Sequence, residues 1–125
     1  MEKHVSTRST IALPGGATNV HSFDLEGGEE ECQVKRIVLS ATEHGSLYGI
    51  TLKVGLFQKQ PTTLADFSDD TIIYSYTYRN QQLLNETTTV RVPQGWFIGI
   101  LMINNDPANA ADASCNLQLN YLSLG

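Results

Sequence analysis

The sequence has few charged residues and no long hydrophobic run. Charged residues make up 17% of the 125 positions, and Asp plus Glu outnumber Lys plus Arg by 13 to 8, which gives a formal net charge of -5. Binding to a phosphate backbone needs clustered Lys and Arg, so the composition argues against a direct nucleic-acid partner. No stretch approaches the roughly 20 apolar residues of a membrane-spanning helix, so we expect no membrane span.

The first ten residues, MEKHVSTRST, contain no apolar segment typical of a secretory signal peptide. The sequence therefore predicts a cytoplasmic protein unless the chain belongs to a virus particle. The Asn85-Glu86-Thr87 triplet matches the glycosylation pattern, but without a signal peptide we expect the match to be accidental. Cys32 and Cys115 lack the spacing of a zinc or redox site. We expect two buried apolar side chains, and whether they lie within bonding distance stays open.

Helical periodicity is also missing, because no segment of ten or more residues places apolar side chains at i, i+3 and i+4. Alternation of period two replaces it, most clearly in residues 48–57, where Ile50, Leu52, Val54 and Leu56 share one face. The most apolar run, 96–103, lies between two turn signals and predicts a central strand buried on both faces. Strands are expected at residues 19–25, 33–42, 48–57, 71–79, 83–92, 96–103 and 115–121.

These patterns predict an all-β protein, an antiparallel β-sandwich of about eight strands and of jelly-roll type, with an immunoglobulin-like sandwich as the competing arrangement. Residues 11–125 would form the sandwich domain. Residues 1–10 are expected to be a flexible N-terminal arm, or an edge strand that pairs only on assembly, since alternate residues from Val5 to Leu13 share one parity. Within 33–42 the apolar residues change from even-numbered to odd-numbered positions, which predicts a bulge near Lys35 or Arg36. The longest connection is 58–70, with a short helical turn at 64–67.

No catalytic pattern is present in the sequence. His4, His21 and His44 are scattered, and neither a G-x-S-x-G nor an HExxH motif occurs. We expect no enzyme activity and no cofactor.

Two groups of acidic residues lie in predicted loops. Carboxylate oxygens are ligands that calcium prefers, but neither group follows the EF-hand spacing. A set of Asn and Asp residues between 104 and 112 is a weaker candidate, because these residues are common in turns. We therefore expect solvated loops and no metal site. The two acidic groups are Glu26, Glu29, Glu30 and Glu31, and Asp66, Asp69 and Asp70.

Four aromatic residues are the candidates for binding a ligand or partner. Tyr74, Tyr76 and Tyr78 alternate along one predicted strand and so share a face, and Trp96 follows a turn. An exposed row would stack on sugars or anchor a protein, because Tyr combines apolar area with a polar tip. The alternative is that the row packs in the core or across strands.

The second half of the chain contains the stretches VRVPQGWFIGILMINND and CNLQLNYLSL. This C-terminal third resembles the closing strands of small viral single jelly-roll proteins, which build capsids, vertex pentamers or capsid decorations of icosahedral viruses. The resemblance implies a structural virion protein that is not an enzyme, and that self-assembles or docks on other capsid proteins. The alternative is a carbohydrate-binding β-sandwich module or a host-attachment spike, with a glycan as its ligand.

Overall fold

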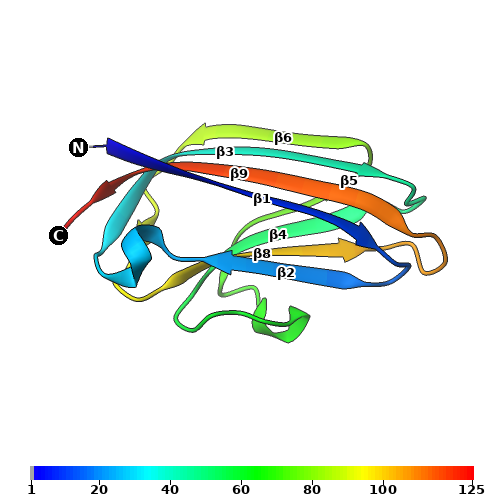
Figure 1. Cartoon of the computed structure of the whole chain (residues 1–125), viewed down its shortest axis with the longest axis horizontal. Helices are drawn as coiled ribbons and strands as arrows, with labels where there is room; N and C mark the ends of the chain where they lie inside the picture. The colour runs from blue at the N-terminus through cyan, green and yellow to red at the C-terminus, as the bar shows by residue number, and fades with distance from the viewer. Residues whose placement is uncertain (1) are drawn as a thin grey trace.

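The computed structural model describes residues 2–125, which form two antiparallel sheets packed as a β-sandwich (Figure 1). One sheet has the strand order β1-β9-β3-β6, with β7 beside β3, and the other has the order β2-β8-β4-β5. The all-β class predicted from the sequence is confirmed. The elements are β1 (Glu2–Leu13), β2 (Thr18–Phe23), η1 (Leu25–Gly28), β3 (Cys32–His44), β4 (Ile50–Phe57), η2 (Leu64–Asp66), β5 (Ile72–Tyr78), β6 (Gln81–Thr87), β7 (Arg91–Val92), β8 (Phe97–Asn104) and β9 (Ala111–Ser123).

The strand order identifies the topology. If the two-residue strand β7 is set aside, the chain changes sheet at every connection except the one from β4 to β5. All sheet neighbours are antiparallel, and β9 returns to lie between β1 and β3. Eight long strands arranged in this way form two Greek keys. The sandwich is a jelly roll, as the sequence predicted.

Residues 2–10, expected to form an arm, are part of β1. This strand pairs with β9 in continuous register from Glu2 opposite Leu122 to Leu13 opposite Ala111. The backbone of β9 supplies the hydrogen bonds that order this segment, which has few apolar side chains, so residues 2–10 belong to an edge strand within the subunit. Figure 1 shows the two chain ends at the same end of the sandwich. Met1 lies outside the described residues.

Other expected elements are refined by the structure. The register between β3 and β9 shifts between Val34 and Arg36, which confirms the predicted bulge. The segment 83–92 splits into β6 and β7, and the last strand begins at Ala111 instead of Cys115. The most apolar run forms β8, which lies between β2 and β4 and is buried over most of its length, as expected for a central strand.

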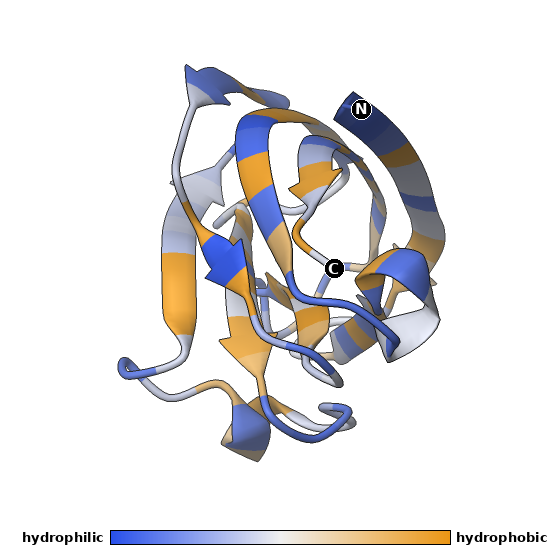
Figure 2. Cartoon of the chain, turned by 90° about the vertical axis from the view of Figure 1, so that its left-hand side faces the viewer, coloured by the Kyte–Doolittle hydropathy of each residue, from blue (hydrophilic) through white to orange (hydrophobic). Residues whose placement is uncertain are grey.

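The core lies between the two sheets and is built from alternate residues of each strand. Ile98, Ile100 and Met102 of β8 face Leu117 and Leu119 of β9 across this space, and all five are at most 3% exposed. Burial of each such side chain contributes roughly 1.5–3 kcal/mol relative to exposure. Figure 2 shows hydrophobic and hydrophilic bands alternating along the strands, as a sandwich with one face toward solvent requires.

The outer faces of the two sheets differ. The connection from β4 to β5 folds over the β2-β8-β4-β5 sheet, where Phe57, Phe67 and Leu101 form a second buried cluster. The β1-β9-β3-β6 sheet has no such cover among the described residues, and we call its outer surface the open face. Four rows of side chains define it: Thr10, Ser114, Thr42 and Gln81; Arg8, Asn116, Ser40 and Leu83; Ser6, Gln118, Val38 and Asn85; and His4, Asn120, Arg36 and Thr87.

Candidate functional site

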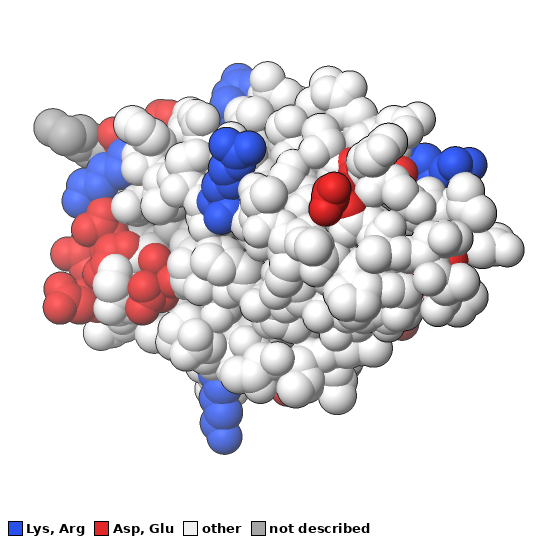
Figure 3. Space-filling model, turned by 45° about the vertical axis from the view of Figure 1, so that its right-hand side comes forward, with Lys and Arg blue, Asp and Glu red and all other residues white. Residues whose placement is uncertain are grey.

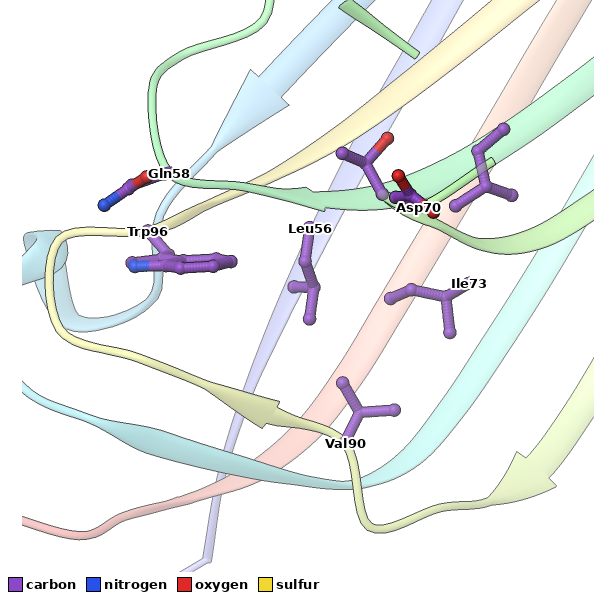
Figure 4. A pocket seen from close by; sticks show the side chains of 8 residues that line it. Leu56, Gln58, Asp70, Ile73, Val90 and Trp96 are labelled. Carbon is purple, nitrogen blue, oxygen red and sulfur yellow. The ribbon is translucent and has the colours of Figure 1, made fainter. Parts of the chain in front are cut away.

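A groove of about 480 Å³ opens into the core beside Trp96. Figure 4 shows Leu56 between Trp96 and Ile73, with Val90 approaching from the segment that leads into β7. Five half-buried apolar side chains line it, and Gln58, Asp70 and Thr71 supply polar groups. A volume in the range of roughly 300–1,000 Å³ with apolar walls and few polar groups is typical of a binding site. We call this feature the Trp96 groove, which is lined by Leu56, Gln58, Asp70, Thr71, Ile72, Ile73, Val90 and Trp96.

Trp96 is placed by the tight turn before β8. The backbone N–H of Trp96 donates to the carbonyl of Pro93 at 3.1 Å, and Gly95 has a φ of 80°. A positive φ at the third turn position favours glycine. The N–H of Gly95 also donates to the carbonyl of Gly28 at 3.0 Å, which ties the turn to η1. The indole therefore projects from a well-fixed backbone.

The opposite wall of the groove comes from a bulge between β4 and β5. The register shifts between Val54 and Gly55, so Gly55 lies opposite Ile72 and Ile73 has no partner on β4. The N–H of Leu56 donates to the carbonyl of Thr71 at 2.9 Å, which holds the start of β5 against the end of β4. A bulge redirects side chains, and here two adjacent isoleucines line the groove.

The tyrosine row predicted as a candidate site faces the space between the sheets. Tyr78 is 4% exposed, and its hydroxyl donates to the carbonyl of Thr42 at 3.1 Å. Burial raises the pKa of Tyr78 well above its usual range. Tyr74 and Tyr76 are half-buried with ring centroids 6.3 Å apart, and the Tyr74 hydroxyl donates to Glu86 at 3.4 Å. Of the four predicted residues, Trp96 alone lines the groove.

The first acidic group lies at one end of the molecule, around η1. Figure 3 shows acidic side chains gathered at one end, while the middle of the visible surface carries few charges. Glu26 accepts a hydrogen bond from Tyr121 at 2.8 Å and forms an ion pair with Lys3 at 3.0 Å. The contact with Lys3 holds the pKa of Glu26 below its usual range. Glu31 pairs with Arg91 at 3.4 Å.

The second acidic group is divided between a turn and the groove. Asp66 accepts hydrogen bonds from the N–H groups of Thr62 and Thr63 at 2.9 and 3.0 Å, and so stabilises η2. These contacts lower the pKa of Asp66. Asp70 lines the Trp96 groove, and Asp69 is exposed beside it. Within residues 2–125, His, Cys, Asp and Glu side chains form no group of three or more that fits a metal ion.

The Asn and Asp residues at the end of β8 and in the loop after it organise the loops at the other end of the molecule. Asn104 is 1% exposed and donates to the carbonyls of Leu13, Pro14 and Asn109 at 2.9–3.3 Å. Asp106 accepts from the N–H of Leu47 at 3.0 Å and from the side-chain amide of Asn109 at 3.0 Å. The hydrogen bond from the Leu47 N–H is the main cause that holds the pKa of Asp106 far below its usual range, and Asn109 adds to it. Asn104 and Asp106 are therefore buried side chains that hold the loops around them in place.

The histidines and cysteines are dispersed. His21 shares a hydrogen bond of 2.7 Å with Thr7, which links the edge strands of the two sheets. Cys32 and Cys115 are buried free thiols, and burial raises the pKa of Cys115 to about 12. Cys115 lies opposite Ala41, whereas Cys32 lies at the other end of β3, opposite Ser123. The expectation of two buried apolar side chains is confirmed. No helix within residues 2–125 has the length and apolar character needed to cross a membrane.

The groove also contains residues that the sequence did not suggest. Leu56 of β4, Ile73 of β5 and Val90 of the segment between β6 and β7 are separate in the sequence, and only the topology brings them to Trp96. A local signal existed for Ile73, because the adjacent isoleucines Ile72 and Ile73 break the alternation of β5. Such a pair indicates a bulge or a strand buried on both faces.

Comparisons place the chain only at the level of its fold. The sequence matches no family model and no curated protein. Among solved structures it is similar to part of latent PorU from Porphyromonas gingivalis, with a TM-score of 0.50 and 8% identity, covering 97% of this chain and 13% of that chain. It is also similar to a chain of Broad Bean Stain Virus, with a TM-score of 0.47, 14% identity and coverage of 100% and 90%. A chain from the infectious bursal disease virus Gx strain gives a TM-score of 0.42, 12% identity and coverage of 96% and 33%.

Proposed function

We propose that the chain is a structural subunit of a virus particle without enzyme activity, a capsid, vertex or decoration protein that self-assembles or docks on other capsid proteins. The observation that carries this proposal is the open face of the β1-β9-β3-β6 sheet. In its four rows the formally charged side chains are Arg8 and Arg36, and most other positions are Ser, Thr, Asn or Gln. The virion would be its location. The resemblance of the C-terminal third to viral single jelly-roll proteins supports the same function.

A surface of this kind is suited to repeated contact between subunits. Charged residues are depleted from the centres of protein interfaces, because they lose hydration on burial and need an exact partner. Hydroxyl and amide groups both donate and accept hydrogen bonds, so they pair across an interface more easily. Leu83, which is 61% exposed, adds apolar area within the face.

Several side chains of the open face are already held in place. Thr42 and Ser114 share a hydrogen bond of 2.7 Å, and Ser6 donates to Asn116 at 3.2 Å. Arg36 donates to Asn85 at 2.6 Å. Side chains ordered before contact lose less conformational entropy on association, which supports a role in assembly.

The test is the mass of the purified protein by light scattering across a concentration series, with electron microscopy of any large species. We expect a defined oligomer or shell. The double substitution Asn116→Glu and Gln118→Glu should weaken it by placing two negative charges in the middle of the open face. The matched control is Lys59→Glu, which makes the same change in net charge in the exposed loop over the other sheet.

A wild-type protein that stays monomeric at every concentration, and that binds no other capsid protein, would contradict the proposal. Equal effects of the double substitution and of Lys59→Glu would show that net charge matters and that the open face does not. Either result would mean that the open face is not an assembly surface, and the proposal would lose its support.

A second candidate is a carbohydrate-binding module or attachment spike, and the position of Trp96 favours it. An aromatic ring with Gln58 beside it, and Asp70 farther along the same groove beyond Leu56 (Figure 4), is an arrangement that could stack on and hydrogen-bond to a sugar. Titration of the single tryptophan's fluorescence with a panel of sugars tests this function. No change in intensity or wavelength across the panel would contradict it.

A further inference from the structure

The loop between β3 and β4 presents two large apolar side chains to solvent. Leu47 is 60% exposed and Tyr48 is 65% exposed. Single exposed apolar residues are common on protein surfaces and need no explanation. Two adjacent ones at the tip of one loop form a projecting apolar group, which we call the knob.

The backbone of this loop is tied down at several points. The N–H of Leu47 donates to Asp106 at 3.0 Å, and the N–H of Ser46 donates to Glu43 at 3.3 Å. The carbonyl of Gly49 accepts from the Ser46 hydroxyl and from the N–H of Asn105, both at 3.1 Å. Glu43, Ser46 and Asp106 are buried. The backbone that carries the knob is therefore fixed before any contact, which reduces the entropy lost on binding.

The knob has a positive charge beside it. Gly49 has a φ of +83°, and a Cβ built there would lie 2.5 Å from the carbonyl oxygen of Tyr78 and 3.1 Å from Cγ of Arg79. The Arg79 side chain thus runs past the base of the knob, and this residue is exposed. A surface that receives the knob should be apolar with a negative charge at its rim.

The Trp96 groove meets both requirements. Its walls are apolar side chains, and Asp70 lies among its polar lining residues. The knob precedes Ile50 at the start of β4, whereas Leu56 of the groove lies at the end of that strand. Six residues of extended strand separate the two by roughly 20 Å. Knob and groove therefore lie toward opposite ends of the subunit, and both remain free on every copy.

We infer that the knob of one subunit docks in the Trp96 groove of a second copy of this chain, with Arg79 facing Asp70. The inference rests on the proposed function and names one of the contacts that would build the assembly. A contact between two different surfaces of identical subunits is heterologous, and it produces rings when the rotation closes. The buried aromatic and aliphatic side chains would be the main contributors to affinity.

The test compares knob and groove variants by sedimentation velocity and light scattering. Leu47→Ser with Tyr48→Ser removes the knob, and Ile73→Asp places a charge in the groove. Each should raise the concentration at half-association roughly thirtyfold or more, as the loss of an interface hot spot does. Leu64→Ser is the matched control, because Leu64 is 44% exposed in η2 and belongs neither to the knob nor to the groove lining. Arg79→Glu should also weaken association, and Asp70→Lys in the same chain should restore it.

Mixing the two variants is the decisive experiment. A knob-deficient chain still has a groove, and a groove-deficient chain still has a knob, so an equimolar mixture of the two should form a one-to-one dimer at a concentration at which neither associates alone. If wild type assembles and the knob and groove variants assemble equally well, the inference is wrong and the proposed function stands. If wild type forms no assembly, both fail. Sugar-induced changes in Trp96 fluorescence without any effect of the variants on mass would assign the groove to a glycan.

Discussion

The outer faces of the two sheets differ in what covers them. The β2-β8-β4-β5 sheet carries Leu101 and Phe57 on its outer side, and the β4–β5 connection with Phe67 covers them. The rings of Phe57 and Phe67 pack edge to face, with centroids 4.6 Å apart. The open face of the other sheet carries polar side chains and has no cover among the described residues. One face is completed within the subunit, and the other is available to a partner.

Glycine explains how the cover lies so close to its sheet. Gly55 and Gly99 are opposite each other in the β4–β8 register and point to the covered side. A Cβ on Gly99 would lie 2.7 Å from the Phe57 ring and 2.8 Å from the Pro61 ring. The absence of side chains at these positions lets the connection pack directly on the strands. The open face has no equivalent pair within its four rows.

The largest effect should come from Leu101→Ala on the covered face. Leu101 is 0% exposed between the sheet and the β4–β5 connection. Loss of a buried leucine side chain leaves a cavity, and we expect the free energy of unfolding to fall by about 2–5 kcal/mol in urea titrations. Leu83→Ala on the open face is the control and should change it by about 0.5 kcal/mol or less. Similar losses for both variants would remove the distinction between the faces.

The next effect should come from Gly99→Ala. The new methyl group would clash with Phe57 and Pro61, so the connection must move away from the sheet. We expect a loss of about 1–3 kcal/mol in unfolding experiments, with faster proteolysis within residues 58–71. Ser75→Ala, at an exposed position on β5 of the same sheet, is the control and should have little effect. Unchanged proteolysis in Gly99→Ala would show that the close packing at Gly99 does not hold the β4–β5 connection in place.

Much of the fold follows from local pattern. The alternation from Ile50 to Leu56 gives the inward face of β4, and the apolar run after Trp96 marks the central strand β8. The parity change in 33–42 locates the β3 bulge. Each of these features depends only on neighbouring residues and on the period of two that a strand imposes.

Pairing across long separations is not contained in such patterns. β1 pairs with β9 at the far end of the sequence, and alternation tells which side chains face the core but not which strand lies beside them. For the same reason the sequence predicted that the three tyrosines share a face. That this face points inward depends on β3 and β6 of the opposite sheet. The Trp96 groove forms only where several separate segments meet, so among its lining residues the sequence had singled out Trp96 as a binding candidate and Asp70 only as part of an acidic group.

A smaller effect, dependent on pH, should appear in the cover of the closed face. The N–H groups of Thr62 and Thr63 hold the pKa of Asp66 below its usual value. A carboxyl group with a lowered pKa stabilises the folded state fully above its unfolded pKa of about 3.9, and this contribution is lost as pH falls through the folded pKa. We expect the Thr62 and Thr63 amide resonances to shift with this titration. Asp66→Asn should abolish the shift, Asp69→Asn should leave it, and a shift that persists in Asp66→Asn would assign it to another group.

The smallest effect on stability should come from Asn116→Ala at the centre of the open face. Asn116 is exposed, and its side chain accepts a hydrogen bond from Ser6 at 3.2 Å, so the free energy of unfolding should change by about 0.5 kcal/mol or less. If the open face is an interface, the same substitution should still weaken assembly in light scattering, because the amide would be buried only between subunits. A loss of stability as large as that of Leu101→Ala would mean that the face supports the fold. Unchanged stability with unchanged assembly would mean that neither the fold nor a partner uses this position.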